Sequence, residues 1–373
     1  MQSKRAKAFS LPFLLAFLLS AAALPASSLR PERLEFSEVW AYLLAGEERF
    51  LDPALPISDL GYFGAGLSPF GKLVGVPKRE SLKGYPGRVH LVVAEVGNQA
   101  LTHFCLDPAY PLRDALIADI VAAAGPFDGV QIDFEAVSQA DYDNFFAFLG
   151  LLKRGLGAKT LSVALPARVS EKSDYFGYER IGRLADRVVV MAYDEHWSTS
   201  APGPVASLEW CGKVAAYALG KVPPERLVMG APFYGRAWAD KALSRAYKYS
   251  SLSELLAEKR IEDVRREGGI PFVEYVEAVT VRLFFDDAAS LHSRLSMYRK
   301  AEVRSVAFWR LGQEDPAVWA SIAAAPSGAA PTGATTPGAA PSGTADGGLA
   351  GIQAFAEAGP ATRLYELRTA PPL

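Results

Sequence analysis

The chain has 373 residues, 50% of them hydrophobic, and its formal net charge at pH 7 is −2. This length allows one large domain or two smaller ones, and the composition allows a sizeable buried core. The near-neutral charge argues against nucleic acid or an anionic membrane surface as the main partner, because both attract proteins with a basic excess.

The N-terminal segment, residues 1–28, has the pattern of a secretory signal peptide. Lys4, Arg5 and Lys7 precede a compact apolar run, Phe13–Leu19, and small residues follow where a peptidase could cut. The run is too short for a comfortable membrane span. We therefore expect export to the periplasm, the cell surface or the extracellular medium, with no stable membrane span after signal cleavage. An uncleaved N-terminal anchor is the alternative.

Eight apolar runs are typical of strands, and helical patterns separate most of them. Their nearly continuous apolar character is that of parallel strands covered on both faces. Alternating strands and helices indicate βαβ units, and eight of them predict an α/β fold, the closed (β/α)8 TIM barrel. A doubly wound open sheet is the alternative, but the glycine-rich phosphate turn that it needs is poorly matched after the first strand. The predicted strands are Glu38–Leu43, Leu60–Leu67, Arg88–Val96, Phe127–Glu135, Thr160–Ala167, Arg187–Asp194, Arg226–Tyr234 and Arg304–Leu311.

The spacing between these strands is uneven in two places. Little helical pattern lies between the first two strands, so we expect a degenerate first helix. The interval between strands seven and eight is too long for one crossover. Within it, Leu252–Arg266 is helical in pattern, and Phe272–Val276 and Thr280–Phe285 are typical of short strands. We therefore expect a small α+β insertion, about residues 239–285, between strand seven and helix seven.

The composition changes after the predicted barrel domain, residues 29–326. Residues 327–348 consist mainly of Ala, Pro, Gly, Ser and Thr, and such a segment is typical of a flexible linker. Residues 349–373 form a short C-terminal appendage to which we assign no role.

The two cysteines, Cys105 and Cys211, belong to distant segments of the barrel pattern. A disulfide is possible in an exported chain, but two buried free thiols are the favoured interpretation. No Cys or His pair has the spacing of metal ligands, so we expect no metal and no cofactor. A cysteine hydrolase built on His103 and Cys105 has no other support in the sequence.

The fourth predicted strand, FDGVQIDFE, alternates apolar and polar side chains. Because side chains alternate between the faces of a strand, Gln131, Asp133 and Glu135 share one face. The opposite face carries apolar residues for the helices, so the polar face is expected to point into the barrel. Glu135 then lies at the C-terminal mouth, where this architecture builds active sites. Buried carboxylates are costly unless paired or functional, so we interpret Asp133 and Glu135 as catalytic rather than as a purely structural network.

This strand resembles the signature DGxDxDxE of family-18 glycoside hydrolases, the chitinase-like superfamily. Asp128, Gly129, Asp133 and Glu135 match the signature, whereas Gln131 stands where it has aspartate. The amide and the segments YDEHW and APGPVASLEW are similar to the branch that includes spore-cortex-lytic N-acetylglucosaminidases. Three further segments resemble family motifs in the expected order: MAYD (Met191–Asp194), GAPFYGRAW (Gly230–Trp238) and VAFWRLGQEDP (Val306–Pro316).

The resemblance implies a retaining hydrolase of β-linked, N-acetylglucosamine-containing glycans, either peptidoglycan or chito-oligosaccharides. The substrate's own 2-acetamido oxygen would attack the anomeric carbon in place of an enzyme nucleophile, an exception to the two-carboxylate scheme. Glu135 would be the general acid and then the base for water. Asp133 would orient the acetamido N–H and stabilise the cationic intermediate, and Tyr193 would hold the acetamido group. The expected substrate-binding residues are Asp194, Trp309 as the floor under the sugar, Tyr234, Arg236 and Met191.

Two residues of the fourth strand are expected to support this chemistry. Asp128 lies on the other face of the strand, where a structural hydrogen-bonding role is expected. Gln131 cannot ionise but can donate a hydrogen bond to Asp133, so we expect Asp133 to be held ionised. An ionised Asp133 would in turn raise the pKa of Glu135, which suits a general acid.

These expectations describe a monomeric exported enzyme with a glycan substrate and no nucleic-acid partner. A non-catalytic carbohydrate-binding relative on the same barrel is the alternative, and the intact Glu135 argues against it. A structural envelope protein is a third interpretation, which only the C-terminal tail favours.

Overall fold

The structure, a computed structural model, describes residues 33–171, 176–240 and 248–325. The predicted signal peptide, the linker at 327–348 and the appendage at 349–373 lie outside the described residues.

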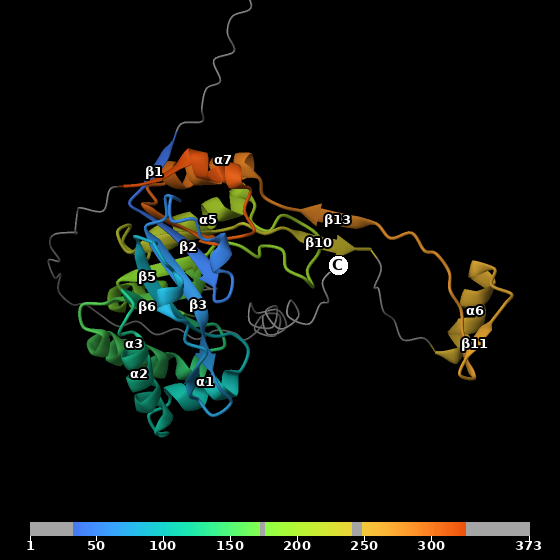
Figure 1. Cartoon of the computed structure of the whole chain (residues 1–373), viewed down its shortest axis with the longest axis horizontal. Helices are drawn as coiled ribbons and strands as arrows, with labels where there is room; N and C mark the ends of the chain where they lie inside the picture. The colour runs from blue at the N-terminus through green and yellow to red at the C-terminus, as the bar shows by residue number, and fades with distance from the viewer. Residues whose placement is uncertain (1–32, 172–175, 241–247, 326–373) are drawn as a thin grey trace, which may run out of the picture. The chain divides into compact units, whose positions relative to one another are not determined.

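Eight parallel strands form a closed barrel (Figure 1). The last strand pairs with the first, and the first pairs with the second, so the sheet has no open end. Each predicted strand is present, and the predicted TIM barrel is confirmed. In chain order the strands are β2 (Glu38–Leu44), β3 (Asp59–Leu67), β5 (Arg88–Glu95), β6 (Gly129–Phe134), β7 (Thr160–Pro166), β8 (Arg187–Met191), β9 (Leu227–Pro232) and β14 (Ser305–Trp309).

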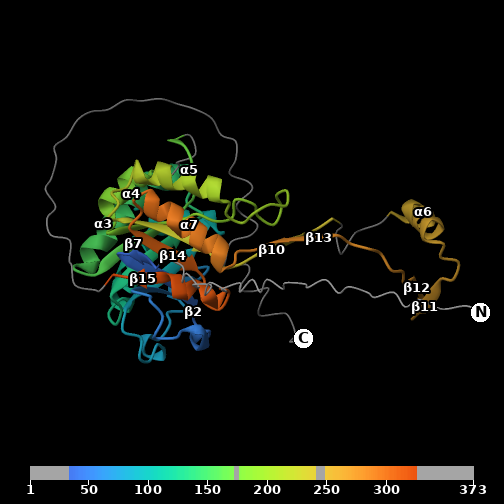
Figure 2. The same ribbon diagram turned by 90° about the horizontal axis from the view of Figure 1, so that it is seen from above.

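Helices surround the barrel (Figures 1 and 2). The expected degenerate first connection holds only the 3₁₀ turn η1 (Glu48–Phe50), and the second connection also lacks an α-helix. Among the described residues, no helix is both long and apolar enough to cross a membrane. The barrel helices are α1 (Gln99–Leu106), α2 (Leu112–Ala123), α3 (Tyr142–Leu156), α4 (Tyr178–Leu184), α5 (Leu208–Leu219) and α7 (Ala288–Lys300). The short elements are β1 (Leu34–Phe36), η1 (Glu48–Phe50), β4 (Leu73–Val74), η2 (Arg79–Ser81), η3 (Gln139–Asp141), η5 (Pro316–Ser321) and β15 (Ile322–Ala324).

Alternation along the strands divides the buried side chains between the outside and the inside of the barrel. On β6, Phe134 points outward and stacks on Phe145 and Phe148 of α3, with ring centroids 6.3 and 5.8 Å apart. The polar residues between its apolar positions point inward, as predicted. The apolar part of the barrel interior consists of Trp40, Tyr42, Leu44, Phe63, Val92, Val189, Val228 and Ala307.

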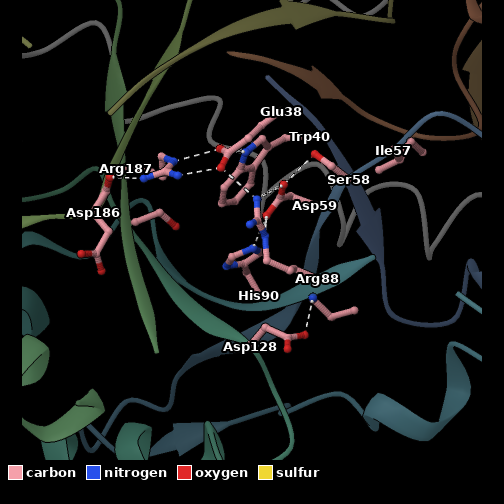
Figure 3. A network of polar contacts seen from close by, with 12 residues as sticks. Glu38, Trp40, Ile57, Ser58, Asp59, Arg88, His90, Asp128, Asp186 and Arg187 are labelled. Atoms are coloured by element: carbon pink, nitrogen blue, oxygen red, sulfur yellow. Dashed lines mark hydrogen bonds and ion pairs between the residues drawn. The ribbon is translucent and has the colours of Figure 1, made fainter. Parts of the chain in front are cut away.

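Charged residues fill the N-terminal end of the barrel interior (Figure 3). Glu38 accepts hydrogen bonds from Arg88 at 2.8 Å and from Arg187 at 2.6 and 2.9 Å. Asp59 accepts two from Arg88, at 2.7 and 2.8 Å, and lies 2.9 Å from Nε2 of His90. Glu38 and Asp59 both have cationic partners, so paired charges fill this end of the barrel.

A small α+β insertion lies between β9 and α7. The predicted strand near 280–285 is confirmed as β13 (Val281–Phe284), which pairs with β10 (Arg236–Ala239) in antiparallel fashion. The predicted helix at 252–266 is shorter, because Arg260 adopts a left-handed conformation (φ 53°) and ends it. Of the predicted strand at 272–276, only Phe272 lies in an observed strand. That residue ends β12 (Ile270–Phe272), because it pairs with Arg265, the first residue of the partner strand β11 (Arg265–Glu267). The elements are β10 (Arg236–Ala239), α6 (Tyr249–Lys259), β11 (Arg265–Glu267), β12 (Ile270–Phe272) and β13 (Val281–Phe284).

Candidate active site

The polar residues of β6 lie toward the C-terminal end of the barrel interior. Gln131 and Asp133 are 0% and 3% exposed, opposite Val92 and Ala94 of β5. Glu135 was expected to end the strand but follows it, and its backbone N–H donates to the Glu95 carbonyl oxygen at 2.9 Å. Its side chain is partly exposed. The strand therefore places one buried carboxylate just before one that solvent reaches.

Asp133 is buried without compensating donors. Its Oδ1 and both side-chain polar atoms of Gln131 have no hydrogen-bond partner among the described residues. Burial raises the pKa of Asp133 to about 7, because a carboxylate removed from water loses hydration that nothing replaces. The expected hydrogen bond from Gln131 is therefore wrong. Burial opposes the ionised form that was expected for Asp133.

Tyr193 follows β8, and its hydroxyl interacts electrostatically with both acids. Its pKa is raised well above the ordinary value, mainly by burial and also by neighbouring groups that include Asp133 and Glu135. The hydroxyl therefore stays neutral and can donate a hydrogen bond. A Cβ at Gly230 would lie 2.7 Å from the Val190 carbonyl oxygen and 3.2 Å from Cε1 of Tyr193. This role of Gly230 was not predicted from the sequence, although glycine inside a strand is a signal of close approach.

Tyr42 is a further polar group of this interior that the sequence analysis did not single out. Tyr42 lies on β2, and burial is the main cause of its raised pKa. The charge of Asp133 raises this pKa further, whereas Gln131 acts to lower it. Its ring centroid is 5.5 Å from that of Trp309, the last residue of β14. Trp309 is partly exposed and packs edge-on against Phe63 at 4.8 Å. The ring of Trp309 thus lies at the C-terminal end of the barrel and packs against Tyr42 and Phe63.

Three residues that were expected to contact the sugar form hydrogen bonds with one another. Asp194 Oδ1 accepts hydrogen bonds from the Tyr234 hydroxyl at 2.6 Å and from Nη2 of Arg236 at 2.5 Å. The rings of Tyr193 and Tyr234 meet edge to face, with centroids 6.2 Å apart. These residues come from two segments, the end of β8 and the start of the insertion, which meet beside Tyr193.

The two remaining predicted site residues have simpler surroundings. Asp128 Oδ2 accepts a hydrogen bond from the Val89 backbone N–H at 2.8 Å, so its carboxylate supports the backbone of β5. Met191 is the last residue of β8 and is partly buried. By strand alternation it shares the inward face with Val189.

The cysteines lie outside this cluster. Cys105 in α1 and Cys211 in α5 are free and buried, so the predicted buried thiols are confirmed. Burial raises the pKa of Cys105 to about 11, which leaves it a thiol rather than a thiolate. In the parts of the chain that the structure describes, no group of three or more His, Cys, Asp or Glu side chains could hold a metal ion.

Comparison with known proteins identifies related sequences. The model of glycosyl hydrolases family 18 matches residues 115–314. The putative sporulation-specific glycosylase YdhD of Bacillus subtilis is 29% identical over 216 residues, which covers 52% of this chain and 49% of that protein. The cortical fragment-lytic enzyme of Bacillus anthracis is 27% identical over 229 residues, which covers 56% and 53%. The chain thus spans about half the length of these curated relatives.

Solved structures show the same fold. The spore cortex-lytic enzyme SleL of Bacillus cereus has a TM-score of 0.62 at 22% identity, covering 77% of this chain and 73% of that one. A chitinase from Chromobacterium violaceum also has a TM-score of 0.62, at 23% identity, covering 76% and 97%. These likenesses support the barrel, and the sequence matches carry the family relationship.

Proposed function

The chain belongs to family 18 of the glycosyl hydrolases, and we propose that it cleaves β-linked, N-acetylglucosamine-containing glycans by substrate-assisted catalysis with retention of configuration. The observation that carries this proposal is the cluster at the C-terminal end of the barrel. There Glu135 lies at a partly exposed position directly after β6, Asp133 is buried near the end of that strand, and the charges of both acids contribute to the raised pKa of Tyr193.

In the first proposed step, the 2-acetamido carbonyl oxygen of the substrate attacks the anomeric carbon. The glycosidic C–O bond breaks, and Glu135 donates its proton to the departing oxygen, which leaves as an alcohol. The oxazolinium-like intermediate carries a positive charge. Asp133 accepts a hydrogen bond from the acetamido N–H and stabilises that charge, while the neutral hydroxyl of Tyr193 holds the acetamido group.

In the second step, a water molecule attacks the same carbon from the face that the leaving group vacated. Glu135, now a carboxylate, takes a proton from that water, and the bond from the acetamido oxygen to the anomeric carbon breaks. The acetamido group is restored, and two displacements retain the configuration. Glu135 ends the cycle protonated, as it began.

The pKa of Asp133 fits this role. A group with a pKa of about 7 is partly neutral before the substrate reacts, which limits the cost of burying a charge. Positive charge that develops on the neighbouring acetamido group favours the ionised form. Asp133 then becomes an anion at the moment when an anion stabilises the intermediate.

We propose bacterial cell-wall glycan rather than chitin as the main substrate, with chito-oligosaccharides as the second candidate. Two relatives, at 27–29% identity, are named for cortical fragment lysis and sporulation-specific glycosylase activity. The signal pattern in residues 1–28 is in keeping with an enzyme that meets such a polymer outside the cytoplasm. We further propose that it acts as a monomer.

Hydrolysis of matched sugar substrates tests the mechanism. We expect release of 4-methylumbelliferone from the N-acetylglucosaminide or chitobioside and cleavage of peptidoglycan fragments, with products identified by mass spectrometry. The plain glucoside, which lacks the acetamido group, should stay intact. Glu135→Gln should lower turnover by at least about 100-fold and retain glycan binding. Comparable cleavage of the glucoside would overturn substrate assistance. A wild type that binds glycans without cleaving any, with turnover appearing only in Gln131→Asp, would overturn the catalytic proposal.

A further inference from the structure

The β8–α5 loop, residues 192–207, is attached to the insertion along one face of β10. Arg236 and Trp238 are two positions apart on this strand and therefore share a face. Arg236 donates to Asp194 at 2.5 Å, and the indole N–H of Trp238 donates to the Trp197 carbonyl oxygen at 3.2 Å. Both hydrogen bonds end on the loop that contains Tyr193.

Asp194 has an unusual backbone that these contacts hold in place. Its φ is +59°, a left-handed value that few residues other than glycine adopt. The surrounding structure must maintain such a conformation, and here the guanidinium of Arg236 and the hydroxyl of Tyr234 bind its carboxylate. Because Asp194 follows Tyr193 directly, the torsion at Asp194 affects where the Tyr193 side chain points.

The strand that carries Arg236 is itself firmly placed. A Cβ at Gly235 would lie 2.7 Å from the Phe284 carbonyl oxygen, so only glycine lets β13 approach this closely. Arg236 then pairs with Phe284 in the ribbon. The Trp238 side chain is 8% exposed and meets the Phe284 ring edge-on at 6.0 Å.

The far end of the loop is closed independently of the insertion. The Glu195 backbone N–H donates to the Val205 carbonyl oxygen at 2.8 Å. Its carboxylate accepts from the backbone N–H and the hydroxyl of Ser207, at 2.7 and 3.1 Å. The loop is therefore a closed unit, and the contacts from β10 determine how its first residues leave β8.

We propose that Arg236 is a positioning residue that, together with Trp238, clamps the β8–α5 loop and so fixes the Tyr193 hydroxyl for the acetamido group of the substrate. Arg236 acts through Asp194 and Tyr193, in place of the direct sugar contact expected from the sequence. The kinetic consequence rests on the proposed function. The clamp itself is a property of the folded chain and can be measured without turnover.

A double-mutant cycle between Arg236 and Tyr193 tests the kinetic part. We expect Arg236→Met and Tyr193→Phe each to lower kcat by about 10- to 100-fold, since small displacements of catalytic groups have effects of this size, with KM changed less than about threefold. The double variant should be no more than about twofold worse than Tyr193→Phe, because a group that acts only through Tyr193 has nothing left to position. Losses that multiply would overturn the proposal, since they indicate a separate contact with the substrate.

Amide hydrogen exchange tests the clamp itself. Arg236→Met should speed exchange in residues 194–207 by at least about tenfold, because local openings there lose their restraint. Arg282→Met, which alters an exposed arginine of the same ribbon, is the matched control and should leave exchange and kcat unchanged. If Arg236→Met does not fold, Arg236→Lys removes the planar fork and keeps the charge, and it should show the same faster exchange. Unchanged exchange would overturn the clamp, whereas a wild type inactive on every glycan would overturn only the proposed function.

Discussion

Replacing Asp133 by asparagine should stabilise the protein in a pH-dependent way. Folding raises the pKa of this carboxyl from 3.8 to about 7, so the folded state binds the proton more tightly than the unfolded state. The wild type therefore loses stability as the pH rises from about 4 to about 7, and the loss is complete above that range. At about 1.4 kcal/mol for each pH unit, it amounts to roughly 4 kcal/mol. Asparagine keeps the shape of the side chain and carries no charge.

Urea unfolding at several pH values measures this effect. The difference in unfolding free energy between Asp133→Asn and wild type should be small near pH 4 and should grow toward roughly 4 kcal/mol near pH 8. Asp119→Asn, on the exposed face of α2, is the control and should show no such trend. The variant should also lose glycosidase activity, because it cannot become an anion. A difference that does not change between pH 4 and pH 8 would refute the reasoning, since it would mean that folding does not raise the pKa of Asp133.

Three further predictions concern other parts of the barrel. Gly230→Ala should lower kcat by at least about tenfold, because a Cβ there approaches the Tyr193 ring and the strand backbone; steady-state kinetics and a thermal melt would separate displacement from unfolding. Interactions with His90 and Arg88 outweigh the effect of burial and lower the pKa of Asp59 to about 2. The wild type should therefore lose about 2 kcal/mol of unfolding free energy as the pH falls from about 4 to 2. In urea unfolding, Asp59→Asn should show no such acid-dependent loss. Trp309→Ala should raise KM for glycans and lower the melting temperature, since its ring packs on Tyr42 and Phe63; unchanged KM would exclude contact with the sugar.

The barrel and the orientation of β6 could be predicted because both depend on local pattern. Eight apolar runs separated by helical patterns have few arrangements other than a barrel, and alternation alone places Asp133 on the inner face. The insertion was predicted less well. Its helix ends where Arg260 turns left-handed, which apolar periodicity does not reveal.

Contacts between distant segments could not be predicted in this way. Glu38 and Arg187 are 149 positions apart in the sequence, and each is a single charge at the start of a different strand. Only closure of the barrel brings them together. The predicted hydrogen bond from Gln131 to Asp133 was wrong for a similar reason. Strand spacing shows that two side chains share a face, but it does not show whether their polar atoms are within hydrogen-bonding distance.

The two ends of the barrel shift the pKa values of their buried carboxyl groups in opposite directions. Asp59 and Asp133 are both almost completely removed from solvent, so burial alone would raise both pKa values. Asp59 has Arg88 and His90 within hydrogen-bonding distance, and its pKa falls to about 2; Asp133 Oδ1 lacks a described donor, and its pKa rises to about 7. The neighbouring hydrogen-bond donors, rather than the degree of burial, therefore decide whether the pKa of a buried carboxyl is raised or lowered. The paired end stabilises the fold near neutral pH, while the end with the proposed active site destabilises it. This is why Asp59→Asn and Asp133→Asn should change stability in opposite directions as the pH rises.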